Sequence, residues 1–456
     1  MKKRWAWELL NESDIESFSK DYKDFLAKVK TEREAVKFIK SEAEKKGFVD
    51  VFSKDKLNKG DKVYLAFRNK FIALAVIGEK DISEGFRLIG SHIDSPRIDI
   101  KPVPLYESFG VAMLKTHYYG GVKKYQWTNI PLALHGVVAL KDGTVKEILI
   151  GEKDDDPVIV IPDLAPHLAK KKQGERKGFE IIKGEELHAV VGNKPLKGEK
   201  EEKDLVVKMV LKILKEEYGI EEEDLVSADL TLVPAIKPRD LGLDRSMILA
   251  YGHDDRVCAY TSLRAILELE GVKETAIAIF VDREEIGSEG DAAAQSRVLE
   301  YFIATLIEKA NGEYNHGKLL KALTNARAIS ADVNAVINPI HKDVHDTQNA
   351  AELGKGVIIT KYTGAGGKYY ASEAHAEYVA WIRKILDEKN IPWQPGLLGK
   401  VDEGGGGTIA KYLANRGLLV VDMGPGVLSL HAPTEIVSKA DVYSTFLAYK
   451  AFYESS

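Results

Sequence analysis

Six acidic and imidazole side chains stand just beyond apolar runs or tight turns, where they could bind divalent metal ions. Carboxylate oxygens and imidazole nitrogens are the ligands that Zn²⁺, Mn²⁺ and Co²⁺ accept where thiolates are absent. The residues with this placement are His92, Asp94, Glu284, Glu285, Asp332 and His431. Because the carboxyl ends of parallel strands share one edge of an α/β sheet, their spacing permits a single metal site.

The adjacent pair Glu284 and Glu285 carries the most specific chemistry of this set. It directly follows the apolar run 277–281, and two carboxylates in a dry cleft repel each other unless a cation neutralises them. Hydrolases with two metal ions need one carboxylate as a ligand and another as a proton shuttle. Glu-Glu pairs are also common on protein surfaces, so this interpretation depends on the whole set of residues.

Two shorter motifs fit the same site but are ambiguous alone. His92 and Asp94 are two residues apart in an extended segment and point the same way, so Asp94 can hold the imidazole and fix its tautomer. A histidine at a strand end is more often a hydrogen-bonded structural residue. Asp254 and Asp255, which an arginine follows, also fit a helix N-cap with an ion pair.

The elements that must position these residues alternate between helix and strand after residue 251. Apolar β-formers predict strands at 276–281 and 326–330, and a helical pattern occupies 259–269 between the first acids and the first of these strands. Such alternation is typical of an α/β fold with a largely parallel sheet. The predicted strands end just before Glu284 and Asp332, as a shared sheet edge requires.

A middle region differs from this pattern. Helix signals are few there, while β-like runs such as 136–140 and 157–161 recur. We therefore predict that residues 1–107 and 248–456 form the catalytic domain and that residues 108–247 form an inserted β-rich domain.

Composition excludes several classes of protein. The 456 residues are 45% hydrophobic, with 65 Lys+Arg against 70 Asp+Glu, which argues against a disordered or a strongly basic nucleic-acid-binding chain. The single cysteine, Cys258, cannot form an internal disulfide or a thiolate zinc cluster. No apolar stretch has the length of a membrane span, and Glu8 interrupts the N-terminus before a signal peptide could form. We expect a cytoplasmic protein without nucleic-acid or membrane partners.

Four further motifs accompany the acids and histidines: GSHIDSPR at 90–97, IPLALH at 130–135, SAD at 330–332 and YYAS at 369–372. The ordered set of acids and histidines resembles the co-catalytic metallopeptidases, and these motifs narrow the resemblance to the M18 aminopeptidases, often called aspartyl aminopeptidases. The similarity extends from about residue 13 to the C-terminus. Asp255 departs from the asparagine that is usual in this family and resembles the neighbouring M42 aminopeptidases instead, which leaves the substrate preference open.

The resemblance implies a phosphorylase/hydrolase-like α/β catalytic domain with a mixed central sheet and an inserted dimerisation domain. It also implies two divalent metal ions per subunit, with zinc expected and cobalt or manganese as alternatives. Asp254 would bridge both ions, Glu284 would accept the proton of the attacking water, and Asp94 would orient a ligand. The remaining ligands would be His92 and Asp332 for one ion and Glu285 and His431 for the other.

Only the family resemblance suggests a functional role for His135. In the family the corresponding histidine reaches from the inserted domain into a neighbouring subunit's site and stabilises the oxyanion. Such a site needs a homo-oligomer, and the family implies a dodecamer built from dimers. On sequence alone, His135 is a histidine in an apolar strand, which favours a hydrogen-bonded core residue.

We predict a metal-dependent aminopeptidase that removes N-terminal residues, with acidic residues as the preference that the family implies. Two alternatives stay open: a co-catalytic amidohydrolase that removes an acyl group or a C-terminal residue, and a non-catalytic, shell-forming assembly protein. For a few further features we prefer an interpretation without a functional role. These are the glycine-rich turn 404–407, the lysines Lys361 and Lys368 that could bind an acidic side chain, and the loop histidines His341 and His345.

Overall fold

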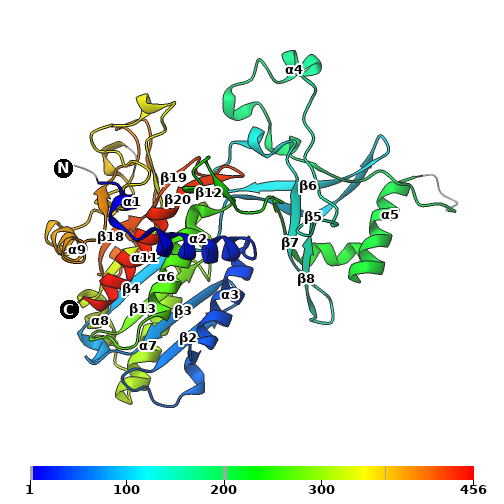
Figure 1. Cartoon of the computed structure of the whole chain (residues 1–456). Helices are drawn as coiled ribbons and strands as arrows, with labels where there is room; N and C mark the ends of the chain where they lie inside the picture. The colour runs from blue at the N-terminus through cyan, green and yellow to red at the C-terminus, as the bar shows by residue number, and fades with distance from the viewer. Residues whose placement is uncertain (1–3, 199–202, 365, 456) are drawn as a thin grey trace. The chain divides into compact units, whose positions relative to one another are not determined.

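The computed structural model describes residues 4–198, 203–364 and 366–455, and the chain forms two compact units (Figure 1). The first unit consists of residues 1–95, 238–430 and 435–456. The second consists of residues 96–237 together with 431–434. The predicted α/β class is confirmed, since helices and several sheets of mixed strand orientation make up the chain.

A nine-stranded mixed sheet is the centre of the first unit. Its four middle strands β13, β4, β14 and β18 are mutually parallel, while β3 and β16 flank them in antiparallel pairing. The parallel centre therefore brings four carboxyl ends to one edge. In sheet order the strands are β1 (Val49–Asp50), β2 (Lys62–Phe67), β3 (Phe71–Val76), β13 (Ala276–Val281), β4 (Arg87–His92), β14 (Arg327–Ser330), β18 (Leu419–Gly424), β16 (Val357–Thr360) and β17 (Trp393–Pro395).

Strand β13 shows why this sheet lies between two helical layers. All six of its residues are buried apolar side chains, and successive residues point to opposite faces. Ala276, Ala278 and Phe280 belong to one hydrophobic core, and Ile277 and Ile279 belong to the other. The first core is packed by α2 (Glu12–Leu26), α3 (Glu32–Lys45), α6 (His253–Leu267), α9 (Ala376–Glu388) and α11 (Lys439–Glu454), and the second by α7 (Val298–Asn311), α8 (His316–Asn325) and α10 (Ala410–Ala414).

A second, five-stranded sheet also belongs to the first unit. Its central strand β20 pairs with β12 and with β19, both antiparallel. The pairing places Glu435 opposite Ala250, just before the start of α6. In order, the strands are β11 (Arg239–Leu241), β12 (Met247–Ala250), β20 (Glu435–Ser438), β19 (Gly426–Leu428) and β15 (Asn334–Ala335).

The second unit is built on a six-stranded antiparallel sheet. It also carries the helices α4 (Pro166–Lys172) and α5 (Leu205–Ile213). Strands β8 and β9 form its two edges. In order the strands are β8 (Val145–Ile150), β7 (Leu132–Ala139), β10 (Ala228–Pro234), β5 (Arg97–Ser108), β6 (Val111–Tyr119) and β9 (Ala189–Gly192).

The boundaries of the second unit differ from the predicted residues 108–247. The unit begins at Pro96 because β5 pairs with β6 and β10 inside the six-stranded sheet. It ends at Lys237 because β11 and β12 pair in the five-stranded sheet of the first unit. The pairings of β5 with β10 and of β12 with β20 join residues far apart in sequence, so local patterns did not reveal them.

The sequence motifs that join Ser13 to Glu16 and Thr31 to Glu34 each predict a capping box at a helix start, and the outcomes differ. At α3, the Thr31 hydroxyl accepts the Glu34 N–H at 3.3 Å and the Glu34 carboxylate accepts the Thr31 N–H at 3.0 Å, which confirms this box. At α2, Asn11 is the N-cap and accepts the Asp14 N–H, so the predicted box at Ser13 is wrong. Asparagine caps a helix as well as serine does, and it lies earlier in the chain.

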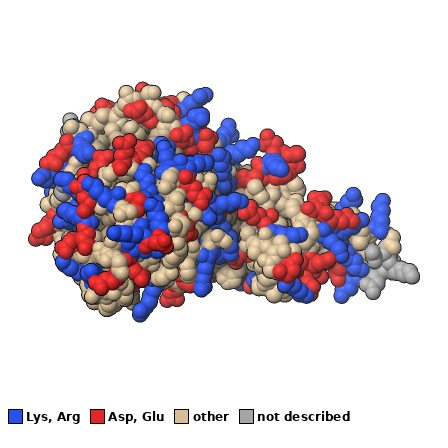
Figure 2. Space-filling view, turned by 90° about the horizontal axis from the view of Figure 1, so that it is seen from below, with Lys and Arg blue, Asp and Glu red and all other residues tan. Residues whose placement is uncertain are grey.

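Two further features are the distribution of charge on the surface and the apolar character of the helices. Figure 2 shows basic and acidic side chains interleaved over the face that it presents. Within the described residues, no helix combines the length and the apolar character that crossing a membrane would require.

Candidate active site

The carboxyl ends of three neighbouring parallel strands bring the predicted residues of the first unit together. His92 is the last residue of β4 and lies opposite Val281, the last residue of β13. Glu284 lies three residues after Val281, and Asp332 lies two residues after Ser330, the last residue of β14. The strand register thus places the three chain segments at one edge, as the sequence predicts.

His92 is the centre of a group of possible metal ligands. Its Nε2 atom lies 3.1 Å from Asp254 Oδ1 and 3.9 Å from Asp332 Oδ1. His92, Asp254, Asp255 and Asp332 each offer one ligand atom, and these atoms all lie within 4.8 Å of one another. Asp254 and Glu285 likewise offer carboxylate oxygens within 4.8 Å. One imidazole with several hard oxygen ligands is a donor set that suits zinc, cobalt or manganese.

Asp94 holds three of these residues in place. One of its oxygens lies 3.2 Å from His92 Nδ1, on the side of the ring away from Asp254. Its two oxygens accept the backbone N–H groups of Glu284 and Glu285, each at 3.1 Å. The side chain is fully buried. Asp94 therefore orients the Glu-Glu segment with its carboxylate, and it orients the imidazole with that carboxylate and with its carbonyl oxygen, which lies 3.1 Å from His92 Nδ1.

Negative charge is crowded in this group. Burial raises the pKa of Asp332 well above its usual value, and the charge of Asp255 raises it further. Burial raises the pKa of Asp255 too, while the charge of His92 opposes that shift. For His92, burial lowers the pKa, but the hydrogen bond to Asp254 and the charge of Asp255 outweigh it, so the pKa lies well above its usual value. Bound divalent cations would relieve this crowding, because they stabilise ionised carboxylates.

Asp255 was not among the predicted ligands. Its Oδ2 accepts the His92 backbone N–H at 3.2 Å, and its Oδ1 is buried without a hydrogen-bond partner among the described residues. The sequence signal was present, since Asp255 stands next to Asp254. An Asp-Asp pair before a helical pattern is also typical of a helix cap, and this interpretation concealed the signal. In the structure, both residues lie in the first turn of α6 but have non-helical backbone angles.

Two predicted site residues belong to the second unit. The Nδ1 atom of His431 lies 2.9 Å from the carbonyl oxygen of Gly121. His135 is 2% exposed, and its Nε2 lies 3.0 Å from Glu152 Oε1. A hydrogen-bonded, buried imidazole is the core residue that the sequence alone favours, so the roles of both histidines stay predictions.

The remaining candidates have local explanations. Lys361 and Lys368 both pair with Glu373, at 3.5 and 3.0 Å. His345 is largely buried and its Nε2 accepts the Asn338 N–H at 3.3 Å, and neither it nor His341 belongs to a metal-type group among the described residues. The glycines 404–407 form a loop before the short helix α10.

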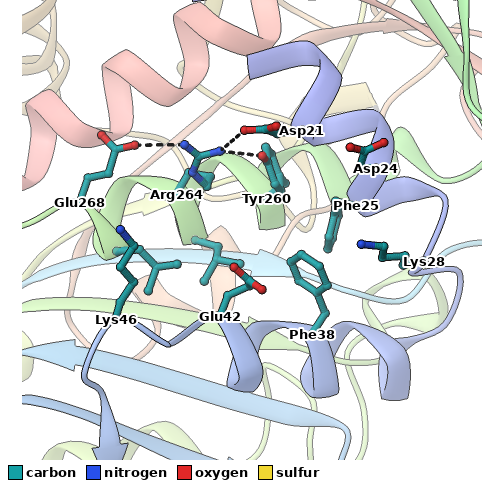
Figure 3. Close-up of a pocket in the computed structure, with 12 residues that line it drawn as sticks. Asp21, Asp24, Phe25, Lys28, Phe38, Glu42, Lys46, Tyr260, Arg264 and Glu268 are labelled. Atoms are coloured by element: carbon teal, nitrogen blue, oxygen red, sulfur yellow. Dashed lines mark hydrogen bonds and ion pairs between the residues drawn. The ribbon is translucent and has the colours of Figure 1, made fainter. Parts of the chain in front are cut away.

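A pocket elsewhere in the first unit is distinct from this group. It lies between α2, α3 and α6, has a volume of about 360 Å³, and is drawn in Figure 3. Arg264 bridges its rim by contacting the Tyr260 hydroxyl at 2.8 Å and the carboxylates of Asp21 and Glu268 at 3.3 Å each. Three of its charged residues, Arg264, Asp21 and Glu268, thus pair among themselves, and none of its lining residues is a predicted site residue.

Comparison with known proteins gives consistent matches over the whole chain. A family model described as aminopeptidase I zinc metalloprotease (M18) matches residues 25–453. A probable M18 family aminopeptidase 1 of Borrelia garinii subsp. bavariensis is 51% identical over 459 residues and covers 100% of both chains. The crystal structure of an M18 family aminopeptidase from Thermotoga maritima is 48% identical, with a TM-score of 0.97 and 100% coverage of both chains.

A more distant structure, the yeast mApe1 dodecamer, shares the fold. It is 21% identical with a TM-score of 0.76, and the match covers 96% of this chain and 97% of that one. The family match spans every predicted site residue, from His92 to His431. The chain therefore belongs to the M18 family of zinc aminopeptidases.

Proposed function

We propose that the chain removes N-terminal residues from peptides. It would use two divalent metal ions per subunit, and zinc is the metal that we expect. Asp254 would bridge both ions, His92 and Asp332 would hold one, and Glu285 and His431 would hold the other. The observation that supports this assignment best is the group of ligand atoms around His92 within 4.8 Å, next to the Glu-Glu pair that Asp94 holds. Cations bound there supply Lewis acidity that polarises the scissile carbonyl and lowers the pKa of an attacking water.

The chain's own residues then move the proton. Glu284 accepts it from the attacking water and passes it to the leaving amine, so Glu284 is the general base and acid rather than a ligand. Its backbone N–H is fixed by Asp94, which keeps the carboxylate beside the reacting atoms. Glu285 is the next residue and takes the ligand role, since its oxygen lies within 4.8 Å of an Asp254 oxygen.

His135 would complete the site of a neighbouring subunit by donating a hydrogen bond to the developing oxyanion. The contact with Glu152 would fix its tautomer and ring orientation. This role requires a homo-oligomer, and the dodecamer of the yeast neighbour supports a similar assembly of dimers here.

The single, buried Cys258 fits a reducing compartment such as the cytoplasm.

The preferred N-terminal residue is the least constrained part of the proposal. An acidic preference would need a free cation, but Lys361 and Lys368 already pair with Glu373. An incoming acidic side chain would have to compete with that carboxylate. Aspartyl, leucyl and lysyl substrates therefore belong in the first experiment.

The test is hydrolysis of free and N-acetylated aminoacyl amides after a chelator has removed metal, with Zn²⁺, Co²⁺ or Mn²⁺ then restored. We expect metal-restored cleavage of the free-amine substrates alone. Cleavage of only the acetylated substrates would instead support a co-catalytic amidohydrolase. Binding of metal without cleavage of any substrate would support a non-catalytic assembly protein.

A further inference from the structure

The start of α6 lacks a cap of its own. Gly252 occupies the N-cap position with a positive φ of 73° and has no side chain to accept a hydrogen bond. A larger residue would be strained at this φ and would displace the Arg256 guanidinium, since a Cβ atom would lie 1.6 Å from Arg256 Nη1. The first N–H groups of this helix must therefore find acceptors elsewhere, and one of them belongs to Asp254.

Glu435 supplies that acceptor from the five-stranded sheet. Its Oε2 accepts the Asp254 N–H at 3.0 Å, although 181 residues separate the two in sequence. The pairing of β12 with β20 places Glu435 opposite Ala250, and the chain then turns at Gly252 toward Asp254. Glu435 is 1% exposed, so its carboxylate is buried in the interior of the first unit.

The other side of the same residue is also held. The Ser95 hydroxyl, fully buried, donates to the Asp254 carbonyl oxygen at 2.5 Å. Both peptide groups of Asp254 are thus fixed by side chains, one from each of two distant segments. The carboxylate of Asp254 remains directed at His92, 3.1 Å away.

We propose that Glu435 is a positioning residue that sets the place of the Asp254 carboxylate and thereby the metal affinity of the site. The inference rests on the proposed function, in which Asp254 is shared by two cations. A shared ligand tolerates little displacement, because it must satisfy two coordination spheres at once. Glu435 acts through the hydrogen bond to the backbone, and its negative charge is secondary.

Two variants separate the hydrogen bond from the charge. Glu435→Gln keeps an acceptor oxygen at the same reach but removes the charge, whereas Glu435→Asp keeps the charge but withdraws the acceptor by one methylene. The measurement is zinc affinity of the full chain, by competition with a chromogenic chelator. Glu32→Ala is the matched control, since Glu32 is a 4% exposed carboxylate on α3 in the same unit.

We expect Glu435→Gln to bind zinc within about threefold of the unaltered chain and Glu435→Asp to bind it about 10- to 100-fold more weakly. Glu32→Ala should lower thermal stability without changing zinc affinity. Unchanged zinc affinity in Glu435→Asp, or an equal loss in both Glu435 variants, would overturn the proposal. Because zinc affinity is measured without substrate, a chain that fails to cleave aminoacyl amides would refute the proposed function and leave this result standing.

Discussion

The two units bury their strands in different ways. In the first unit, β3, β4 and β13 are buried along their whole length because helices cover both faces of the sheet. In the second unit, the edge strand β8 has mostly exposed or part-buried residues. This unit has fewer than half as many residues as the first, yet nearly half of the exposed large apolar side chains in the described parts of the chain belong to it.

This difference separates two tasks. The first unit completes its own core and brings most of the predicted ligands together, which requires rigid strands that are packed on both sides. The second unit exposes more large apolar side chains for its size, and such side chains mark a contact with another protein chain where they form one patch. If the separation holds, substitutions in the first unit should affect chemistry and metal, and substitutions in the second, apart from His135 and His431, should affect assembly.

The strongest test of the catalytic unit is Asp254→Asn. The amide offers one oxygen without a charge, so we expect zinc binding and aminopeptidase activity to be lost together, with activity reduced at least about 10⁴-fold. Zinc content by mass spectrometry and hydrolysis rates measure both. Asp422→Asn is the matched control, since Asp422 is a buried carboxylate on β18 that accepts the Thr408 hydroxyl. Zinc loss in both variants would mean that any buried acid of this sheet has the same effect.

Glu284→Gln should separate chemistry from metal within the Glu-Glu pair. We expect kcat to fall about 10²- to 10⁴-fold with zinc content unchanged, because glutamine cannot accept the proton of the attacking water. Glu285→Gln should lose zinc as well as activity. If Glu284→Gln loses the zinc and Glu285→Gln keeps it, the two roles must be exchanged.

His135→Gln tests whether the second unit takes part in chemistry. A donor aimed at the oxyanion contributes about 10²- to 10³-fold to kcat, so we expect a loss in that range with KM little changed. His188→Gln in the same unit is the control, since His188 is held by the Tyr106 hydroxyl at 2.6 Å. Equal and small effects of both substitutions would confine catalysis to the first unit and sharpen the comparison.

Paired substitutions of exposed apolar residues test the assembly task. Leu168 and Phe179 of the second unit are each 69% exposed, and changing both to Glu should raise the dissociation constant of the oligomer at least about tenfold. Leu320→Glu with Tyr301→Glu, at similarly exposed positions of the first unit, should leave it unchanged. Analytical ultracentrifugation over a dilution series measures both. A larger effect of the first-unit pair would reverse the assignment.

The smallest expected effect concerns one ion pair of the second unit. Hydrogen bonding from Arg176 lowers the pKa of Glu186 from 4.5 to about 2. A lowered pKa in the folded state means stability that is present above pH 4.5 and is lost as the pH falls toward 2. Since Glu186 is one-third exposed, we expect Glu186→Gln to cost about 1 kcal/mol of local stability at pH 7 and almost nothing at pH 2. Hydrogen exchange of residues 173–187 measures it, and an equal cost at both pH values would contradict the assignment.

The parallel centre of the catalytic sheet is the part of the fold that sequence predicts best. Its strands are short apolar runs, and Glu284 and Asp332 follow two of them within three residues, so one local rule locates both strand and site. Asp94 could also be placed, because its partner His92 is two residues away. The roles of these residues in catalysis stay predictions.

Features that depend on distant pairing were not predictable. The unit boundary at Pro96 follows from the pairing of β5 with β10, whose residues come after residue 227. Glu435 caps Asp254 across 181 residues, and in sequence it is only an acid at the start of a strand. Single-sequence patterns report local periodicity, and they carry no information on which distant segment becomes a neighbour.

The position of the insertion governs the order of events during synthesis. Strand β4 ends at His92, four residues before the second unit begins, and both of its sheet neighbours, β13 and β14, are made after residues 96–237. A ribosome adds about 5–20 residues per second, so β4 stays unpaired for roughly 10–40 s. The second unit can fold within that interval, whereas the catalytic sheet must wait. The insertion thus sets the minimum time during which a nascent chain carries an unshielded, aggregation-prone strand.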